Sequence, residues 1–151
     1  MKIDTNLTLF HRLNQISRLL TKRANQALQP FDLYSAQWTV IYTLKTKGTL
    51  TQRELCEYLA VEAPPLTRNV QRLVKKGLVR QVCGRDKRTK RIELTEVAQA
   101  QYPIWERTMA EVKQQLMDGV SSDTEEQLDK LLVDWLSTIE QETCHEQREE
   151  R

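Results

Sequence analysis

The chain of 151 residues is 39% hydrophobic and 29% charged, and 23 basic against 21 acidic residues give it a formal net charge of +2. This balance predicts one domain with a hydrophobic core over residues 1–151, and no apolar run approaches the ~18 residues of a membrane helix, so we expect a cytoplasmic protein without membrane contact. The sequence has no Gly-rich phosphate loop, no nucleophile elbow and no zinc-ligand spacing, so we expect no enzyme, cofactor or metal site.

Two helices are predicted before residue 48. Four aliphatic residues recur at helical spacing near the start of the chain: Leu9, Leu13, Ile16 and Leu20. They predict an amphipathic helix that ends near Pro30. A second helix follows, with Ser35 as its candidate N-cap and Gly48 as its end.

The next segment carries two shorter helices. Thr51 and Glu54 have the spacing of a capping box, which predicts a helix from there to about Leu59. The following helix opens with residues 63–65 (Ala-Pro-Pro), because proline lacks an amide that the first turn of a helix leaves unpaired anyway. One face of this helix is apolar and the other is basic, and Gly77 ends it.

A β-hairpin and two further helices are predicted after residue 77. Residues 78–83 and 90–94 read as strands, joined by a charged loop over residues 84–89. Thr95 is the candidate N-cap of a long helix that ends around Gly119.

The last predicted helix starts at a second capping box, formed by Ser122 and Glu125. An apolar stripe follows it at helical spacing: Leu128, Leu131, Leu132, Trp135, Leu136 and Ile139. We expect residues 143–151 to form a frayed polar tail.

The charges are strongly segregated along the chain. Residues 68–91 hold ten Lys or Arg and a single acid, Asp86, whereas residues 95–151 hold fourteen Asp or Glu and five Lys or Arg. Such segregation lets a protein present one cationic face to phosphate groups and another face to itself or to solvent.

Three helices, of which the last is basic, followed by a hairpin with a cationic loop, form the layout of a winged helix-turn-helix. The predicted fold class is therefore mainly α with a small β-hairpin wing, and the predicted partner is double-stranded DNA, because a helix fits the major groove while a wing reaches the backbone or minor groove. The predicted DNA contacts are Pro65, Thr67, Arg68, Gln71, Arg72 and Lys75 on the helix and Arg85, Lys87, Arg88 and Lys90 on the wing. Arg and Gln suit bidentate contacts to bases, whereas Thr67 and Lys75 suit phosphates.

The wing carries a recognisable motif. Residues 86–88 (Asp-Lys-Arg) are followed by residues 92–95 (Ile-Glu-Leu-Thr), which fits the pattern Asp, any residue, Arg, three residues, an aliphatic residue, any residue, Leu and Thr. Two further segments carry a resemblance: residues 66–68 (Leu-Thr-Arg) and 73–79 (Leu-Val-Lys-Lys-Gly-Leu-Val). On these motifs the chain resembles the MarR family of bacterial transcription regulators, in which the two segments correspond to the DNA-reading helix, called the recognition helix, and to its exit.

The resemblance implies a repressor that binds a pseudo-palindromic operator as a homodimer. Residues 35–95 would form the DNA-binding part, and residues 1–30 and 96–142 the dimerisation helices. The apolar stripe of the last helix supports a dimer independently, because it has little else to bury against. Relatives commonly release DNA when a small aromatic or anionic ligand enters a cleft between these parts, and the candidate lining residues here are His11, Arg12, Tyr34, Trp38, Tyr42 and Trp105.

Several alternatives stay open. Cys83 lies beside the wing near Arg80 and Arg85, so the release signal can be thiol oxidation and not a ligand. A winged-helix module that binds proteins and not DNA is a further alternative, although its exposed helix would then carry apolar anchors. Aromatic residues at helical spacing often belong to the core. Asp86 is expected to orient a neighbouring arginine through an ion pair.

Overall fold

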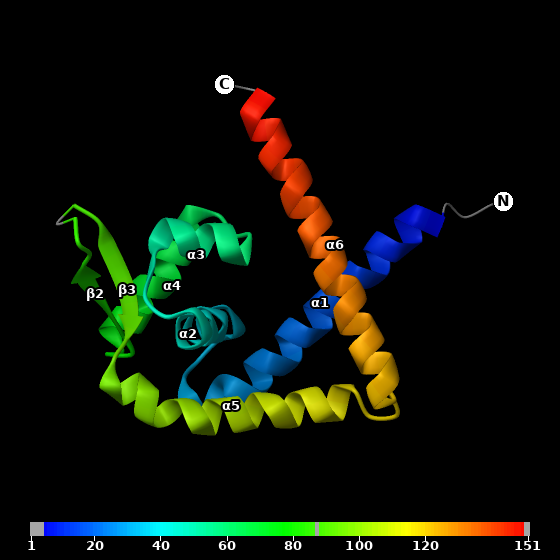
Figure 1. Ribbon diagram of the computed structural model, residues 1–151. Coiled ribbons are helices and arrows are strands. Elements are labelled where there is room, and N and C mark those ends of the chain that lie inside the picture. The colour runs from blue at the N-terminus through cyan, green and yellow to red at the C-terminus, as the bar shows by residue number, and fades with distance from the viewer. Residues whose placement is uncertain (1–4, 87, 150–151) are drawn as a thin grey trace. The chain divides into compact units, whose positions relative to one another are not determined.

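The computed structural model describes residues 5–86 and 88–149, with side chains at residues 7–86 and 88–142. The chain is mostly helical and carries a small antiparallel sheet, as predicted (Figure 1). It forms two compact units, residues 1–112 and residues 113–151. Within the described ranges, no helix has the length and apolar character needed to cross a membrane.

The first unit begins with two helices joined by a corner. α1 (Thr5–Leu28) leads into the single 3-10 turn η1 (Gln29–Phe31), and α2 (Ser35–Lys47) follows. Both predicted helices are confirmed, and Pro30 sits inside the turn that ends the first of them. Asp32 closes this turn in the left-handed region, with a φ of 54°, a conformation that Asp tolerates better than most residues.

The predicted N-cap of α2 is wrong. Tyr34 occupies the N-cap position, and Ser35 is the first helical residue. The backbone N–H of Ser35 donates to Oδ1 of Asn25 at 2.7 Å, and the Tyr34 N–H donates to Oε1 of Gln37 at 3.2 Å. The start of α2 is therefore satisfied partly from α1, by a side chain ten positions upstream, which spacing rules for local caps do not reveal.

The helix-turn-helix consists of α3 (Gln52–Leu59) and α4 (Ala63–Lys75). The predicted capping box is confirmed: the Glu54 N–H donates to Oγ1 of Thr51 at 3.1 Å, and the Thr51 N–H donates to Oε2 of Glu54 at 2.7 Å. α4 begins at the predicted residue and is followed by Gly77, whose φ of +70° turns the chain into the wing.

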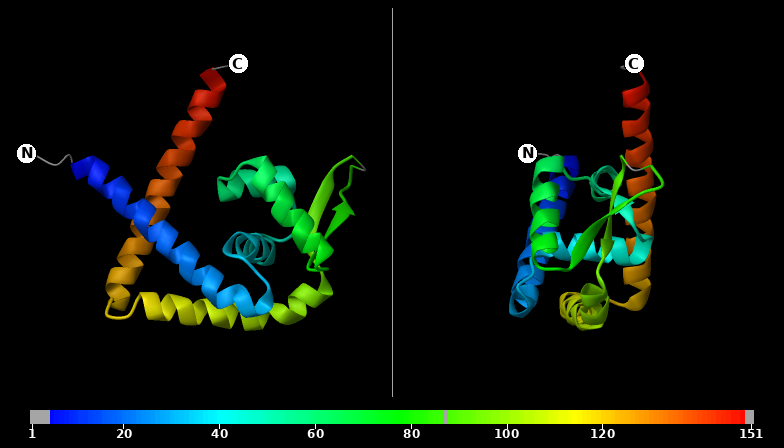
Figure 2. Two further views of the ribbon diagram at one scale, coloured as in Figure 1. Left: turned by 180° about the vertical axis from the view of Figure 1, so that it is seen from behind. Right: turned by 90° about the vertical axis from the view of Figure 1, so that its left-hand side faces the viewer.

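In the described residues the sheet has three strands, one more than predicted. β2 (Val79–Cys83) and β3 (Lys90–Leu94) form the expected hairpin, which lies at the edge of the first unit (Figures 1 and 2). β1 (Leu50–Thr51) pairs antiparallel with the other edge of β3, so the strand order is β1-β3-β2. Two residues are too few to show an alternating pattern, and this explains why the sequence did not indicate β1.

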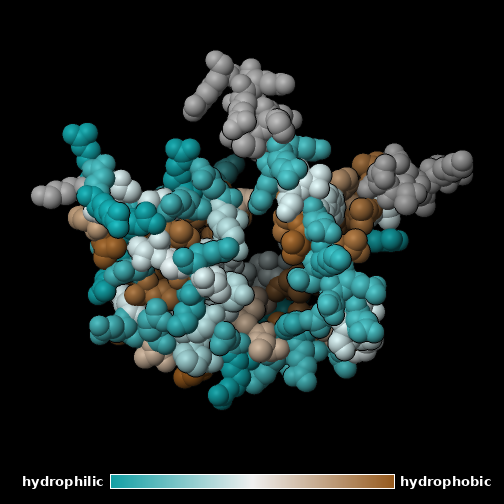
Figure 3. All heavy atoms as spheres, viewed as in Figure 1, coloured by the Kyte–Doolittle hydropathy of each residue, from teal (hydrophilic) through white to brown (hydrophobic). Residues whose placement is uncertain are grey.

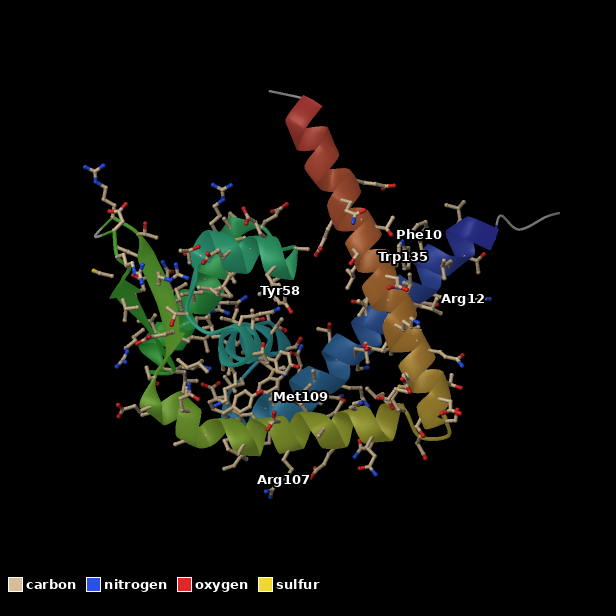
Figure 4. The ribbon with its side chains drawn as sticks, viewed as in Figure 1. Phe10, Arg12, Tyr58, Arg107, Met109 and Trp135 are labelled. Atoms are coloured by element: carbon tan, nitrogen blue, oxygen red, sulfur yellow. The ribbon has the colours of Figure 1, made fainter. Side chains whose placement is uncertain are left out.

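The hydrophobic core of the first unit lies where its helices and sheet meet. Both views of the ribbon place α2 between the α3–α4 pair and α5 (Glu96–Leu116) (Figures 1 and 2). The largest fully buried side chains include Leu28, Ile41, Leu55, Leu73, Ile92 and Trp105. On α5, Met109 packs against this core while Arg107 points away from it (Figure 4).

The predicted cap of α5 is confirmed, because the Ala98 N–H donates to Oγ1 of Thr95 at 3.3 Å. The helix continues through Pro103 and reaches the second unit. The second unit holds α6 (Ser122–Glu149) after a turn at Gly119, whose φ is +82°.

The predicted cap of α6 is one residue out. Ser121 is the cap and not Ser122, since the Thr124 N–H donates to Oγ of Ser121 at 3.2 Å. Within this unit Lys113 pairs with Glu125, a contact that raises the pKa of the lysine through a side-chain hydrogen bond and charge attraction.

Candidate nucleic-acid interface

α4 divides its side chains between the core and solvent. Leu66, Val70 and Leu73 are buried against the other helices. The opposite face exposes four of the predicted contact residues: Arg68, Gln71, Arg72 and Lys75. Pro65 is also exposed, in the first turn of α4. This division follows from the helical repeat, because residues three and four positions apart share a face.

Thr67, the remaining predicted contact on α4, already makes two hydrogen bonds within the protein. Its hydroxyl donates to the carbonyl of Ala63 at 2.8 Å and accepts from Nε2 of Gln52, the first residue of α3. A hydroxyl has one proton to donate, so Thr67 must give up its bond to Ala63 before it can donate to a phosphate.

The wing loop exposes the predicted cations. Arg85, Arg88 and Lys90 are all exposed, and the hairpin end of the first unit carries hydrophilic surface (Figure 3). Lys87, also predicted as a contact, lies outside the described residues.

Asp86 shapes the turn of this loop and does not pair with an arginine side chain as expected. Its carboxylate accepts the backbone N–H of Arg88 at 3.1 Å, and its carbonyl accepts the N–H of Thr89 at 2.9 Å. This local bonding is typical of Asp in turns, and no ion pair joins the Asp86 carboxylate to an arginine in the described part of the chain.

Of the nine cations of residues 68–91 that the structure describes, three are engaged within the protein. Lys76 lies 3.0 Å from Oδ2 of Asp32 and also donates to the carbonyl of Asp32. Nε of Arg80 lies 2.6 Å from Oε1 of Glu93. The third, Arg91, donates to the carbonyl of Thr49 at 2.8 Å.

Six other cations of this segment form no ion pair with any described residue, and all six are exposed. We name them the cationic surface: Arg68, Arg72, Lys75, Arg85, Arg88 and Lys90. An unpaired exposed cation needs no internal partner to be displaced before it meets a phosphate. The counts of charge in the sequence could not separate these six from the engaged three, because their partners lie up to 44 positions away.

The structure brings together two of the six residues predicted to line an effector site. The ring centroids of Trp38 and Tyr42 lie 5.8 Å apart, and Trp38 also stacks on Tyr102 at 5.5 Å. Trp38 is half-buried, whereas 47% of Tyr42 is exposed. Tyr102, which lies on α5, was not among the predicted lining residues.

Burial is the main cause that raises the pKa of Tyr102 to about 12, and the carboxylate of Glu106 raises it further. Lys45 lies 5.2 Å from the centroid of the same ring, which fits a cation–π contact. Tyr102 itself is only 4% exposed, so the aromatic cluster reaches the surface through Tyr42 and part of Trp38.

The other four predicted lining residues lie elsewhere. Trp105 is only 2% exposed and belongs to the core, as one open alternative had it. Tyr34 is exposed at the start of α2, and His11 and Arg12 are exposed on α1 (Figure 4). A surface hollow on α1 is lined by residues outside the predicted set: Ser17, Arg18, Thr21, Lys22, Asn25 and Gln26.

Cys83 is an exposed free thiol on the wing strand β2, and Cys56 is half-buried and free. Among the described side chains, no group of three or more His, Cys, Asp and Glu residues could hold a metal ion.

Comparison with known proteins finds a family model and a relative that resemble the chain. A family model described as MarR family matches residues 31–89. Over 97 residues the chain is 48% identical to YwoH of Bacillus subtilis (strain 168), an uncharacterized HTH-type transcriptional regulator, and the match covers 64% of this chain and 71% of that protein.

Solved structures agree with this match. Wild-type MarR from E. coli in its apo form is 27% identical with a TM-score of 0.71, covering 85% of this chain and 96% of that chain. A MarR mutant from E. coli complexed with operator DNA is 25% identical with a TM-score of 0.79, covering 90% of this chain and 99% of that chain. These relatives are regulators, which confirms the prediction that the chain is not an enzyme. The chain belongs to the MarR family of transcriptional regulators.

Proposed function

We propose that this regulator binds double-stranded DNA through α4 and the wing, with sequence read by α4. The observation that carries the proposal is the cationic surface, in which six exposed cations on one helix face and one hairpin loop have no acidic partner among the described residues. Arg68 and Arg72 offer guanidinium donors that can bind both acceptors of a guanine edge, and the amide of Gln71 can donate to and accept from an adenine edge in the major groove. The related MarR structure with operator DNA supports this assignment.

We propose further that the DNA-binding form is a homodimer. α1 exposes large apolar residues that a stable monomer would bury: Leu7, Leu9, Ile16, Leu19 and Leu20, between 47% and 70% exposed. α6 does the same with Leu128, Leu131, Leu132, Val133 and Leu136. Exposed apolar surface of this extent marks an interaction site, and a two-fold dimer would place two copies of α4 about one helical turn apart, ~34 Å, on a pseudo-palindromic operator.

The regulation that fits this DNA-binding surface is repression that a small molecule relieves. A dimer bound over a promoter would block RNA polymerase simply by occupying the site, so repression would not require a second surface that binds the polymerase. The exposed ring of Tyr42 beside the half-buried ring of Trp38 favours a planar aromatic effector, because aromatic rings stack on one another.

The experiment is selection of genomic fragments with the purified full chain at a low and a high salt concentration, beginning with the promoter region upstream of its own gene. Enrichment of a short inverted repeat, lost steeply as salt rises, is the expected result. Salt-sensitive retention without an enriched sequence would refute sequence-specific reading and leave a nonspecific DNA-binding role. The absence of any retained DNA would favour the protein-interaction alternative.

A further inference from the structure

Arg91 differs from the other cations of the wing because its side chain turns back into the protein. It lies on β3 directly opposite Thr51 of β1, and 35% of its side chain is exposed. Nη2 of Arg91 donates to the carbonyl of Thr49 at 2.8 Å and lies 3.5 Å from Oε2 of Glu54. This side chain therefore joins the returning strand of the wing to the amino end of α3.

The same end of α3 is bonded to α4. Gln52, the first residue of α3, donates through Nε2 to the hydroxyl of Thr67 on α4. Glu54 meanwhile holds the Thr51 N–H at 2.7 Å, so the carboxylate that faces Arg91 is itself fixed to the backbone. Polar contacts at the amino end of α3 thus reach the wing on one side, through Arg91, and α4 on the other, through Gln52, and the backbone of α3 joins the two sets. We name these residues the polar bridge: Arg91, Thr49, Glu54, Gln52 and Thr67.

The surroundings of Arg91 restrict its strand further. The side chain of Arg91 passes close to Gly84 at the entry to the wing loop, where an added Cβ would come 3.5 Å from Cδ of Arg91. On the same strand, Glu93 accepts from Nε of Arg80 at 2.6 Å and from the Thr49 hydroxyl at 3.4 Å. β3 is consequently tied to both of its neighbouring strands, and Arg91 is the cation that ties it to α3.

We propose that Arg91 is a positioning residue of the DNA interface: through the polar bridge it fixes where the wing loop lies relative to α4, and it does not itself contact phosphate. The inference rests on the proposed DNA binding. Its physical basis is that Arg85 and Arg88 can contact the DNA backbone only if the wing loop lies at the right distance from the groove that α4 occupies. A wing loop without a fixed position would lose conformational entropy whenever DNA binds, and this loss would weaken the affinity.

The test is a double-mutant cycle on operator affinity with Arg88→Ala, Arg91→Met and the double variant. If Arg91 acts by placing the wing, Arg91→Met should weaken binding about tenfold or more, and adding Arg88→Ala should then cost less than about twofold, because the wing is already disengaged. Additive losses would overturn the proposal, since independent phosphate contacts add. Lys90→Met is the matched control, an exposed and unpaired cation one residue away, in which Arg88→Ala should keep its full effect.

Arg91→Lys keeps the charge and provides an answer even if Arg91→Met destabilises the fold. A phosphate contact predicts unchanged affinity for this variant, whereas the polar bridge predicts a loss, because the shorter lysine cannot reach both Thr49 and Glu54 from its place on β3. Retained affinity in Arg91→Lys would overturn the proposal.

Amide hydrogen exchange separates this inference from the proposed function, because it needs no DNA. Arg91→Met should speed exchange in β1 and the wing loop, while Lys90→Met should not. If the wild-type protein binds no DNA at all, the proposed function fails, and faster exchange in Arg91→Met alone would still support the positioning role of Arg91. Equal exchange in the two variants would overturn it.

Discussion

The dependence of operator affinity on salt follows directly from the cationic surface. Arg68 and Arg72 are assigned to base edges, which leaves four cations of this surface for phosphates: Lys75, Arg85, Arg88 and Lys90. Each phosphate neutralised on B-DNA changes the slope of log K against log salt by about −0.9, so four cations give a slope of about −4 for each half-site and about −7 for a dimer on a full operator. Raising the salt from about 50 to about 200 mM should therefore weaken each half-site about 10²-fold.

The assay is fluorescence anisotropy of a labelled operator duplex at several salt concentrations. Lys75→Ala should make the slope shallower by about 0.9 for each half-site if that side chain meets a phosphate. Arg107→Ala is the control, because Arg107 is exposed on α5 and points away from the core, on a different element from the cationic surface (Figure 4). A wild-type slope shallower than about −3 on the full operator would mean that most of these four cations make no phosphate contact, and the proposed interface would be wrong.

Four further predictions concern the fold that carries this surface. Trp105→Ala should lower the free energy of unfolding by about 3–5 kcal/mol in urea titrations, because the ring is 2% exposed and its loss leaves a cavity; a loss below about 1 kcal/mol would contradict its place in the core. Thr51→Ala should cost about 1 kcal/mol by removing the cap of α3. Because the Thr51 backbone and hydroxyl lower the pKa of Glu54, the stability that this carboxylate adds at neutral pH should fade as the pH falls through that lowered pKa, and Glu54→Gln should remove this part of the acid sensitivity. Tyr102 should ionise near pH 12 in an ultraviolet absorbance titration. Because the unfolded chain would ionise this tyrosine near pH 10, the free energy of unfolding should fall between pH 10 and about 12, and Tyr102→Phe should flatten that part of the profile. Ionisation near pH 10 in the folded protein would show that the ring is not buried as described.

The sequence was sufficient for the elements whose signals are local. The start of α4 follows from two prolines that need no amide partner, and the cap of α3 follows from Thr51 and Glu54. The wing followed from alternation and turn residues around a charged loop. These features depend on contacts within a few residues, which spacing along the chain records directly.

What the sequence could not supply depends on contacts between distant residues. Asn25 caps α2 from another helix, and β1 exists because β3 offers it an edge. The same limit applied to the interface, where Arg91 and Lys76 add to the cationic count of residues 68–91 but are engaged with Thr49 and Asp32. Trp105 stayed open between pocket and core, because helical spacing alone does not tell which aromatic ring faces inward, and its burial assigns it to the core.

Lys76 connects the end of α4 with the corner between α1 and α2. It directly follows the last residue of α4, and its ammonium group contacts the carboxylate and the carbonyl of Asp32 at that corner. Asp32 itself lies in the left-handed region that few non-glycine residues adopt. Because Lys76 holds both the carboxylate and the carbonyl of Asp32, a change in the angle between α1 and α2 would strain the contact at the carboxyl end of α4.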